Sequence, residues 1–137
     1  MTVKIKTDLL VIGAGAGGLS VAAGAAQLGI KVVLLEGDKM GGDCLNYGCV
    51  PSKALIAFSN QRKPKQFNDA MDFVRDAINE IEPHDSEDRF RSLGVNVIRE
   101  YGQFVNETTV AAGAYEIQPR RIVIATGVHT PVPDISG

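Results

Sequence analysis

A glycine pattern near the N-terminus constrains the fold of this chain more than any other feature. The apolar run Asp8–Ile12 has the composition of a buried parallel strand, and Gly13-Ala-Gly-Ala-Gly-Gly18 follows it at once. In a strand-turn-helix unit, Gly13 permits the tight turn and Gly15 lets the backbone approach a diphosphate. Gly18 lets the helix pack closely on the strand. The helix N-terminus then offers free N–H groups to an anion.

A second strand predicted over Lys31–Glu36 ends on a carboxylate. A carboxylate at this position accepts hydrogen bonds from ribose hydroxyls and repels a 2′-phosphate, which disfavours NADP at this site. Strand, glycines, helix, strand and acid in one register favour a dinucleotide site over the alternative, a glycine-rich structural turn. The sequence therefore predicts an α/β class: a Rossmann-like domain with a parallel sheet and flanking helices.

The uncharged stretch Leu9–Ile30 raises the alternative of a signal peptide or membrane span. Six glycines interrupt this stretch, which is unfavourable for a uniform apolar helix. The formal net charge of -2 gives no electrostatic reason to expect nucleic acid or an acidic membrane as partner. We therefore expect a soluble, cytoplasmic protein that binds neither.

The chain contains 2 cysteines, Cys44 and Cys49, which lie five positions apart in a C-x₄-C spacing. Such a pair would lie about 8.6 Å apart between Cα atoms in a regular helix, whereas a disulfide needs about 4.4 to 6.8 Å. If the two cysteines bond, the segment cannot be one continuous helix. Gly48 and the Gly41-Gly42 pair supply the backbone freedom for a break. A metal site is the rival interpretation, but C-x₄-C without further Cys or His nearby offers too few ligands.

The stretch Gly41-Gly-Asp-Cys-Leu-Asn-Tyr-Gly-Cys-Val-Pro-Ser-Lys53 resembles the redox-active disulfide motif of class I pyridine nucleotide–disulfide oxidoreductases. These flavoenzymes include dihydrolipoamide dehydrogenase, glutathione reductase and mercuric reductase. The resemblance implies that Cys49 faces the flavin of FAD and forms the charge-transfer thiolate. It also implies that Cys44 is the interchange thiol that meets the substrate, and that Lys53 lies near the flavin.

Three positions bear on the branch of the family. Asp43 stands where the family often has Thr, and Tyr47 where it often has Val. A carboxylate close to Cys44 is expected to raise the pKa of that thiol, because two negative charges repel. Ser52 argues against the glutathione reductase branch, which usually carries Lys there.

The rest of the chain predicts two helices and a run of short strands. An amphipathic helix is expected over residues 67–82, with a core-facing stripe of Phe67, Ala70, Met71, Val74, Ala77, Ile78 and Ile81. A short helix capped by Asp85 or Ser86 and ended by Gly94 should follow. Strands are expected around residues 95–97, 101–105, 108–110, 115–117 and 121–125: a third sheet strand, a small β-meander and a strand that returns to the cofactor.

The resemblance extends to two later positions. Gly102 matches the family position where the backbone approaches the adenine, and Ala125-Thr-Gly127 matches a turn that closes over FAD. The residues expected to bind the cofactor are Gly13, Gly15, Ala16, Gly17, Gly18, Glu36, Gly37, Gly41, Gly42, Asp43, Lys53, Gly102, Ala125, Thr126 and Gly127.

As a whole, the chain is similar to the N-terminal part of the FAD-binding domain of a longer enzyme. The resemblance implies an electron relay between NAD(P)H, FAD and a dithiol or disulfide substrate, most similar to dihydrolipoamide dehydrogenase. It also implies a homodimer, with the NAD(P) and dimerisation domains outside residues 1–137. We expect the isolated chain to be inactive and its sheet to have an unpaired edge that favours self-association. Three alternatives stay open: a mercuric reductase-like enzyme, a flavin-binding redox sensor, and a plain NAD-dependent dehydrogenase.

Overall fold

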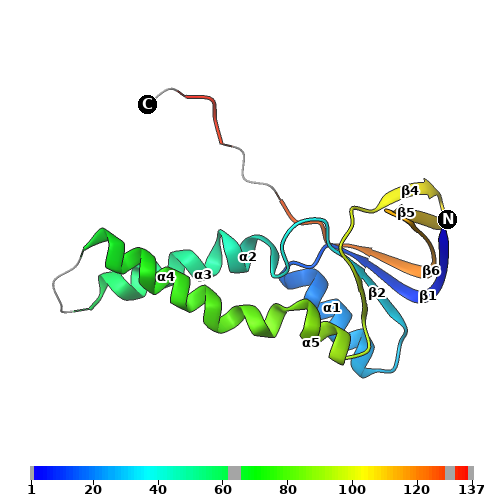
Figure 1. The fold of residues 1–137 in the computed structure, drawn as a ribbon, viewed down its shortest axis with the longest axis horizontal. Coiled ribbons are helices and arrows are strands. Elements are labelled where there is room, and N and C mark those ends of the chain that lie inside the picture. The colour runs from blue at the N-terminus through cyan, green and yellow to red at the C-terminus, as the bar shows by residue number, and fades with distance from the viewer. Residues whose placement is uncertain (1, 62–65, 129–131, 136–137) are drawn as a thin grey trace.

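The computed structural model describes residues 2–61, 66–128 and 132–135 and shows a sheet flanked by helices (Figure 1). The elements follow in the order β1 (Val3–Ile12), α1 (Ala16–Gln27), β2 (Val32–Leu35), α2 (Gly42–Asn46), α3 (Cys49–Ser59), α4 (Phe67–Ile81), the 3₁₀ helix η1 (Glu82–Asp85), α5 (Glu87–Ser92), β3 (Asn96–Ile98), β4 (Gln103–Asn106), β5 (Thr109–Ala112) and β6 (Tyr115–Ile124). Within the described residues, no helix combines the length and the apolar character that crossing a membrane requires.

The six strands form one sheet in the order β3-β2-β1-β6-β5-β4. The pairs β3-β2, β2-β1 and β1-β6 are parallel, while β6-β5 and β5-β4 are antiparallel. The prediction of a Rossmann-like α/β fold with a small meander is confirmed. The sheet is mixed, because the antiparallel meander strands β5 and β4 are hydrogen-bonded onto the edge of its parallel half at β6.

Strand β6 corrects the prediction of two short strands at residues 115–117 and 121–125. It is one strand of 10 residues that pairs with β1 along nearly its whole length. Pro119 lacks an N–H group, yet it lies within β6, opposite Thr7. On its other side β6 pairs with β5 only at Tyr115–Ile117. Within the described part of the chain, residues 118–124 therefore have a strand partner on one side alone, as expected for an unpaired edge.

Two apolar clusters cover the two faces of the sheet. Helices α1 and α5 pack on one face, where Leu19, Ala22 and Phe90 meet Val11 and Leu34. The other face is covered by the curled meander strands, whose buried side chains pack against those of β1, β2 and β3: Leu10, Ile12, Val33, Leu35, Ile98, Val110, Ala112 and Ile117. Figure 1 shows β4 and β5 on the opposite side of β1 and β2 from α1 and α5.

Helix α4 packs on α3 and extends with it away from the sheet as a hairpin (Figure 1). The helix itself is confirmed, but its predicted core-facing stripe is only partly buried. Val74 is buried, whereas Phe67 is 77% exposed and Ile81 is 37% exposed. The reason is that this helix packs on α3, with a smaller contact to α2, and not on the sheet.

Gly18 packs against the turn that precedes α1, as predicted. A Cβ atom on Gly18 would lie 1.8 Å from the carbonyl oxygen of Gly13 and 3.3 Å from the side chain of Val11. Gly24, on the same helix, has open space where its Cβ would be. The two glycines therefore offer a matched comparison.

We predict that Gly18→Ala lowers the free energy of unfolding by about 1 to 3 kcal/mol, because backbone must move to make room. Gly24→Ala should raise it by about 0.5 to 1 kcal/mol, since alanine has the higher helix propensity. Urea unfolding followed by circular dichroism measures both. Equal effects of the two substitutions would contradict the packing role of Gly18.

Candidate functional site: a glycine turn beside a pair of thiols

The turn between β1 and α1 depends on Gly13. This residue has φ +103°, and a Cβ atom there would lie 2.3 Å from the carbonyl oxygen of Ala125. Its N–H donates to the carbonyl of Leu35 at 2.8 Å, so the turn is fixed by both neighbouring strands. Gly15 is the N-cap of α1 and has no side chain that could cap the helix. The first N–H groups of α1 therefore remain available to an anionic ligand.

A second glycine pair lies directly on this turn. The Gly41 N–H donates to the carbonyl of Ala14 at 2.9 Å. Gly42 has φ +58°, and a Cβ atom on it would lie 2.7 Å from the Cα of Gly15. Helix α2, which carries Cys44, begins at Gly42. The contact between the two backbones therefore fixes the thiol-bearing segment beside the N-terminus of α1.

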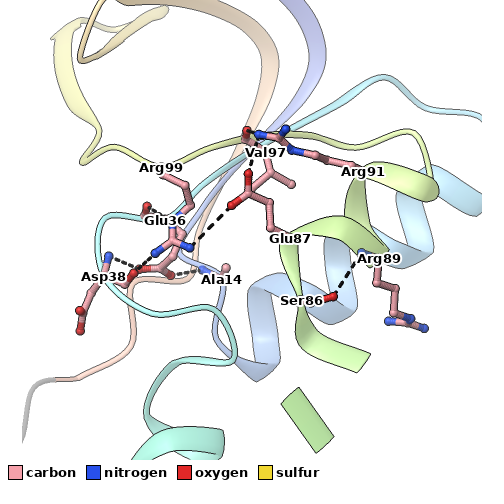
Figure 2. Close-up of polar contacts among 9 residues, drawn as sticks. All are labelled: Ala14, Glu36, Asp38, Ser86, Glu87, Arg89, Arg91, Val97 and Arg99. Carbon is pink, nitrogen blue, oxygen red and sulfur yellow. Dashed lines mark hydrogen bonds and ion pairs between the residues drawn. The ribbon is translucent and has the colours of Figure 1, made fainter. Parts of the chain in front are cut away.

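Glu36 follows β2, and its carboxylate connects the glycine turn after β1 with the loop after β2 (Figure 2). Its Oε2 accepts a hydrogen bond from the Ala14 N–H at 2.7 Å, and its Oε1 accepts one from the Asp38 N–H at 2.7 Å. A carboxylate has about four lone-pair positions, so both oxygens retain the capacity to accept from ribose hydroxyls.

A crevice of about 300 Å³ opens at the carboxyl ends of β1, β2 and β6. Eight of the predicted cofactor-binding residues line it: Gly13, Gly15, Glu36, Gly42, Asp43, Ala125, Thr126 and Gly127. Sequence reasoning did not assign five further lining residues to the cofactor site: Asp38, Lys39, Tyr47, Tyr101 and Val128. The position of the crevice agrees with the general rule that open α/β sheets bind ligands at the carboxyl ends of their strands.

The other predicted cofactor residues do not line the crevice: Ala16, Gly17, Gly18, Gly37, Gly41, Lys53 and Gly102. Several have packing roles instead. A Cβ atom on Gly37 would lie 2.5 Å from the ring of Tyr101, and one on Gly102 would lie 2.9 Å from the side chain of Leu35. A Cβ atom on Gly41 would lie 2.4 Å from the side chain of Leu45.

Lys39 and Tyr47 form a contact that the sequence did not reveal. The Lys39 ammonium lies over the Tyr47 ring, 5.0 Å from its centroid. Hydrogen bonding to Tyr47 and then the charge of Tyr47 raise the pKa of Lys39. Both residues line the crevice, which adds a cation to a site where Glu36, Asp38 and Asp43 are acidic. The only sequence signal was the replacement of the usual Val by Tyr47.

The two cysteines lie on either side of a helix break, as the spacing argument required for a pair that can bond. Cys44 is in α2 and Cys49 is the first residue of α3, with Tyr47 and Gly48 between the helices. Cys44 is partly buried and Cys49 is exposed, and both are free thiols. Hydrogen bonding to the Cys49 side chain is the largest cause that raises the pKa of Cys44, so the two thiols interact across the helix break.

The pKa of Cys44 is raised, as predicted, but the prediction that Asp43 raises it was wrong. After the hydrogen bond to Cys49, burial and the charge of Cys49 raise the pKa of Cys44, while a Cys49 backbone hydrogen bond and the charge of Lys53 lower it. Asp43 is not among these groups. Its carboxylate lies 3.2 Å from the position of a Cβ on Gly48, at the start of α3.

The fold and this arrangement define a Rossmann-like α/β domain that carries a pair of interacting thiols beside its first glycine turn. Comparison with known proteins identifies the family. The model of the pyridine nucleotide-disulphide oxidoreductase family matches residues 7–137, and the chain belongs to this family.

Individual relatives agree with this assignment. Dihydrolipoyl dehydrogenase 2, chloroplastic, from Arabidopsis thaliana is 34% identical over an alignment of 143 positions. The alignment covers 92% of this chain and 25% of the relative. Dihydrolipoyl dehydrogenase from Pseudomonas aeruginosa is 57% identical over 56 residues, which cover 41% of this chain and 12% of the relative. The structure of the HOCl-induced flavoprotein disulfide reductase RclA from Escherichia coli superimposes with a TM-score of 0.81 at 29% identity, covering 95% of this chain and 30% of that chain. The chain thus spans at most about a third of the length of these relatives.

We predict that Cys49→Ala lowers the pKa of Cys44, because it removes both the hydrogen bond and the neighbouring charge that raise it. A raised pKa means less thiolate at a given pH, so iodoacetamide should alkylate Cys44 faster at pH 8 in Cys49→Ala than in the reduced wild-type chain.

Mass spectrometry of the alkylated Cys44 peptide across a pH series measures this difference. Asp43→Asn provides the matched control and should leave the pH profile of Cys44 unchanged. A profile that shifts in Asp43→Asn but not in Cys49→Ala would contradict the assignment of the cause to Cys49.

Proposed function

We propose that this chain is the FAD-binding, dithiol-bearing part of a flavoprotein disulfide oxidoreductase similar to dihydrolipoamide dehydrogenase. The observation that carries the proposal is the backbone contact of Gly41-Gly42 with Ala14 and Gly15. This backbone contact brings α2 and the start of α3, which carry Cys44 and Cys49, next to a turn of the kind that binds a diphosphate. Family membership and the dihydrolipoyl dehydrogenase relatives support the same class of chemistry.

The residues present fit FAD. The glycine turn leaves room for a diphosphate at the N-terminus of α1, and the Glu36 carboxylate is free to accept from a ribose. A carboxylate at this position opposes a 2′-phosphate, which favours FAD or NAD over NADP here. The Lys39 ammonium at the same crevice adds a positive charge that a diphosphate would favour.

The chemistry assigned to the chain's own residues is thiol–disulfide exchange. The Cys44–Cys49 disulfide takes up two electrons and two protons to give the two thiols, and the reverse step returns them. When bound, FAD supplies or accepts this electron pair. Cys44 keeps its proton to a higher pH than an ordinary thiol, because Cys49 and burial disfavour its charged form. We assign Cys44 to exchange with a dithiol or disulfide substrate and Cys49 to the flavin side.

In the whole enzyme we place NAD(P) binding and homodimerisation outside residues 1–137. Electrons then pass between NAD(P)H and the substrate through FAD and the cysteine pair. Dihydrolipoamide, a dithiol, is the substrate that we favour, since the relatives reported above include dihydrolipoyl dehydrogenases from a plant and a bacterium.

The substitution Gly15→Ala tests whether Gly15 is needed for binding the cofactor or for the fold. Its Cβ would lie 3.9 Å from the Cα of Gly42, an ordinary contact, so the fold should tolerate alanine there. If the backbone at Gly15 approaches the diphosphate of FAD, the methyl group should weaken FAD binding about tenfold or more. Titration by quenching of flavin fluorescence measures the affinity, with Gly24→Ala as control. Unchanged FAD affinity in Gly15→Ala would contradict the diphosphate site.

The cysteine pair as a second two-electron acceptor besides FAD is tested by counting electrons. The oxidised, FAD-loaded chain should take up two electron pairs per flavin in an anaerobic dithionite titration, one for FAD and one for the disulfide. FAD-loaded Cys44→Ser, which cannot form the disulfide, should take up one electron pair per chain, into FAD. The wild-type chain without FAD should also take up one pair per chain, into the disulfide. Equal uptake by the loaded wild type and loaded Cys44→Ser would overturn the proposed redox role of the cysteines.

A further inference from the structure

One guanidinium fixes the loop that carries the ribose-side carboxylate. Arg99 directly follows β3 and reaches back to the loop after β2 (Figure 2). Its Nε donates to the main-chain carbonyl of Glu36 at 3.3 Å, and its Nη2 donates to the carbonyl of Asp38. The planar fork of Arg99 therefore binds two carbonyl groups of a three-residue segment at once, from 61 positions further along the chain.

The other side of the same guanidinium is anchored to α5. Its Nη1 lies 3.8 Å from the Oε2 of Glu87, and the Oε1 of Glu87 lies 2.5 Å from the Nη2 of Arg91. Arg91 in turn donates to the carbonyl of Val97 at 3.3 Å. Glu87 thus lies between two guanidinium groups, and it also stands in the first turn of α5, where a carboxylate is favoured. These contacts fix the direction of the Arg99 side chain.

The Asp38 backbone transmits the contact to the carboxylate. Its N–H donates to the Oε1 of Glu36, while its carbonyl accepts from Arg99. The other Glu36 oxygen accepts from Ala14 in the glycine turn. Without the Arg99 contacts the backbone at Asp38 could rotate. The Asp38 N–H, one of the two donors that orient Glu36, would then no longer point at the carboxylate.

We propose that Arg99 is a positioning residue for ribose recognition: it holds the loop so that the Glu36 carboxylate is oriented toward the adenosine ribose of the dinucleotide. This inference rests on the proposed FAD site. Arg99 does not itself line the crevice, so it acts through Asp38 and Glu36. Its side chain is 42% exposed, which leaves its charge largely screened, and the hydrogen-bonding fork is the important feature. Lysine, with one compact ammonium, cannot reproduce that fork.

The first test uses the chain without cofactor. Hydrogen exchange of the Asp38 and Ala14 amides, followed by NMR, should become about fivefold faster in Arg99→Gln and also in Arg99→Lys. Arg75→Gln is the matched control, because Arg75 is exposed on α4 and forms its ion pair with Asp72, away from the Glu36 loop. Exchange rates that are unchanged in Arg99→Gln, or restored in Arg99→Lys, would overturn the positioning role.

The second test compares FAD with the analogue whose adenosine ribose lacks the 2′-hydroxyl group. Arg99→Gln should weaken FAD binding about fivefold and weaken binding of the analogue clearly less, since Glu36 acts through the ribose hydroxyls. In a Glu36→Gln background the Arg99→Gln substitution should have no further effect, because the two residues act as one unit. Equal losses for both ligands, or additive losses in the double variant, would overturn the ribose role of Arg99.

The two tests also distinguish failure of the inference from failure of the proposed function. A wild-type chain that binds neither FAD nor the analogue would overturn the FAD site and the ribose role together. The exchange comparison would still decide whether Arg99 positions Glu36. A wild-type chain that binds FAD, with an Arg99→Gln variant that binds it equally well, would overturn only the inference about Arg99.

Discussion

The contact between two stretches of glycine backbone determines where the chemistry of this chain lies. Gly42 packs on Gly15 at a distance that leaves no room for a side chain on Gly42, and the Gly41 N–H donates to Ala14. Main-chain atoms can approach so closely only where Cβ atoms are absent. The loop after β2 therefore cannot lie far from the first turn, and α2 must start beside the N-terminus of α1. Glycines that in the sequence alone could indicate a flexible loop thus form a close packing contact between two backbone segments.

The same crowding continues on the other side of the turn. A Cβ on Gly13 would overlap the carbonyl of Ala125, whose N–H donates to Ile12 at 2.8 Å. The end of β6 is thereby held over the start of α1, and four chain segments line the crevice, the fourth carrying Tyr101 after β3. Each segment follows the carboxyl end of a parallel strand, since β3, β2, β1 and β6 run in the same direction.

The sequence predicted those features that depend on local residues alone. The roles of Gly13 and Gly18, the acid after β2, the break between the cysteines and the Ser86 cap of α5 all follow from residue type and spacing, and the structure contains each of them. It could not predict contacts that require the fold. Arg99 reaches Asp38 only because β3 lies beside β2. Likewise, the two predicted strands merge into β6 because β1 offers a continuous edge, which outweighs the local signal of Pro119. The cause of the Cys44 pKa shift depends on which side chains meet across the helix break, and neighbours in sequence do not reveal that.

The two ends of the crevice are therefore held by different kinds of interaction. At the glycine turn, steric exclusion and buried backbone hydrogen bonds fix the geometry, and neither depends appreciably on salt. At the ribose side, the loop from Glu36 to Asp38 is fixed by an arginine fork whose ionic partner, Glu87, is also partly exposed. Exposed ion pairs contribute only about 0 to 1 kcal/mol each, so the loop must be held mainly by the hydrogen bonds that Arg99 donates to its carbonyl groups. The end of the crevice proposed to bind the diphosphate is thus fixed by packing, whereas the end proposed to bind the ribose is ordered by a few polar contacts at the surface.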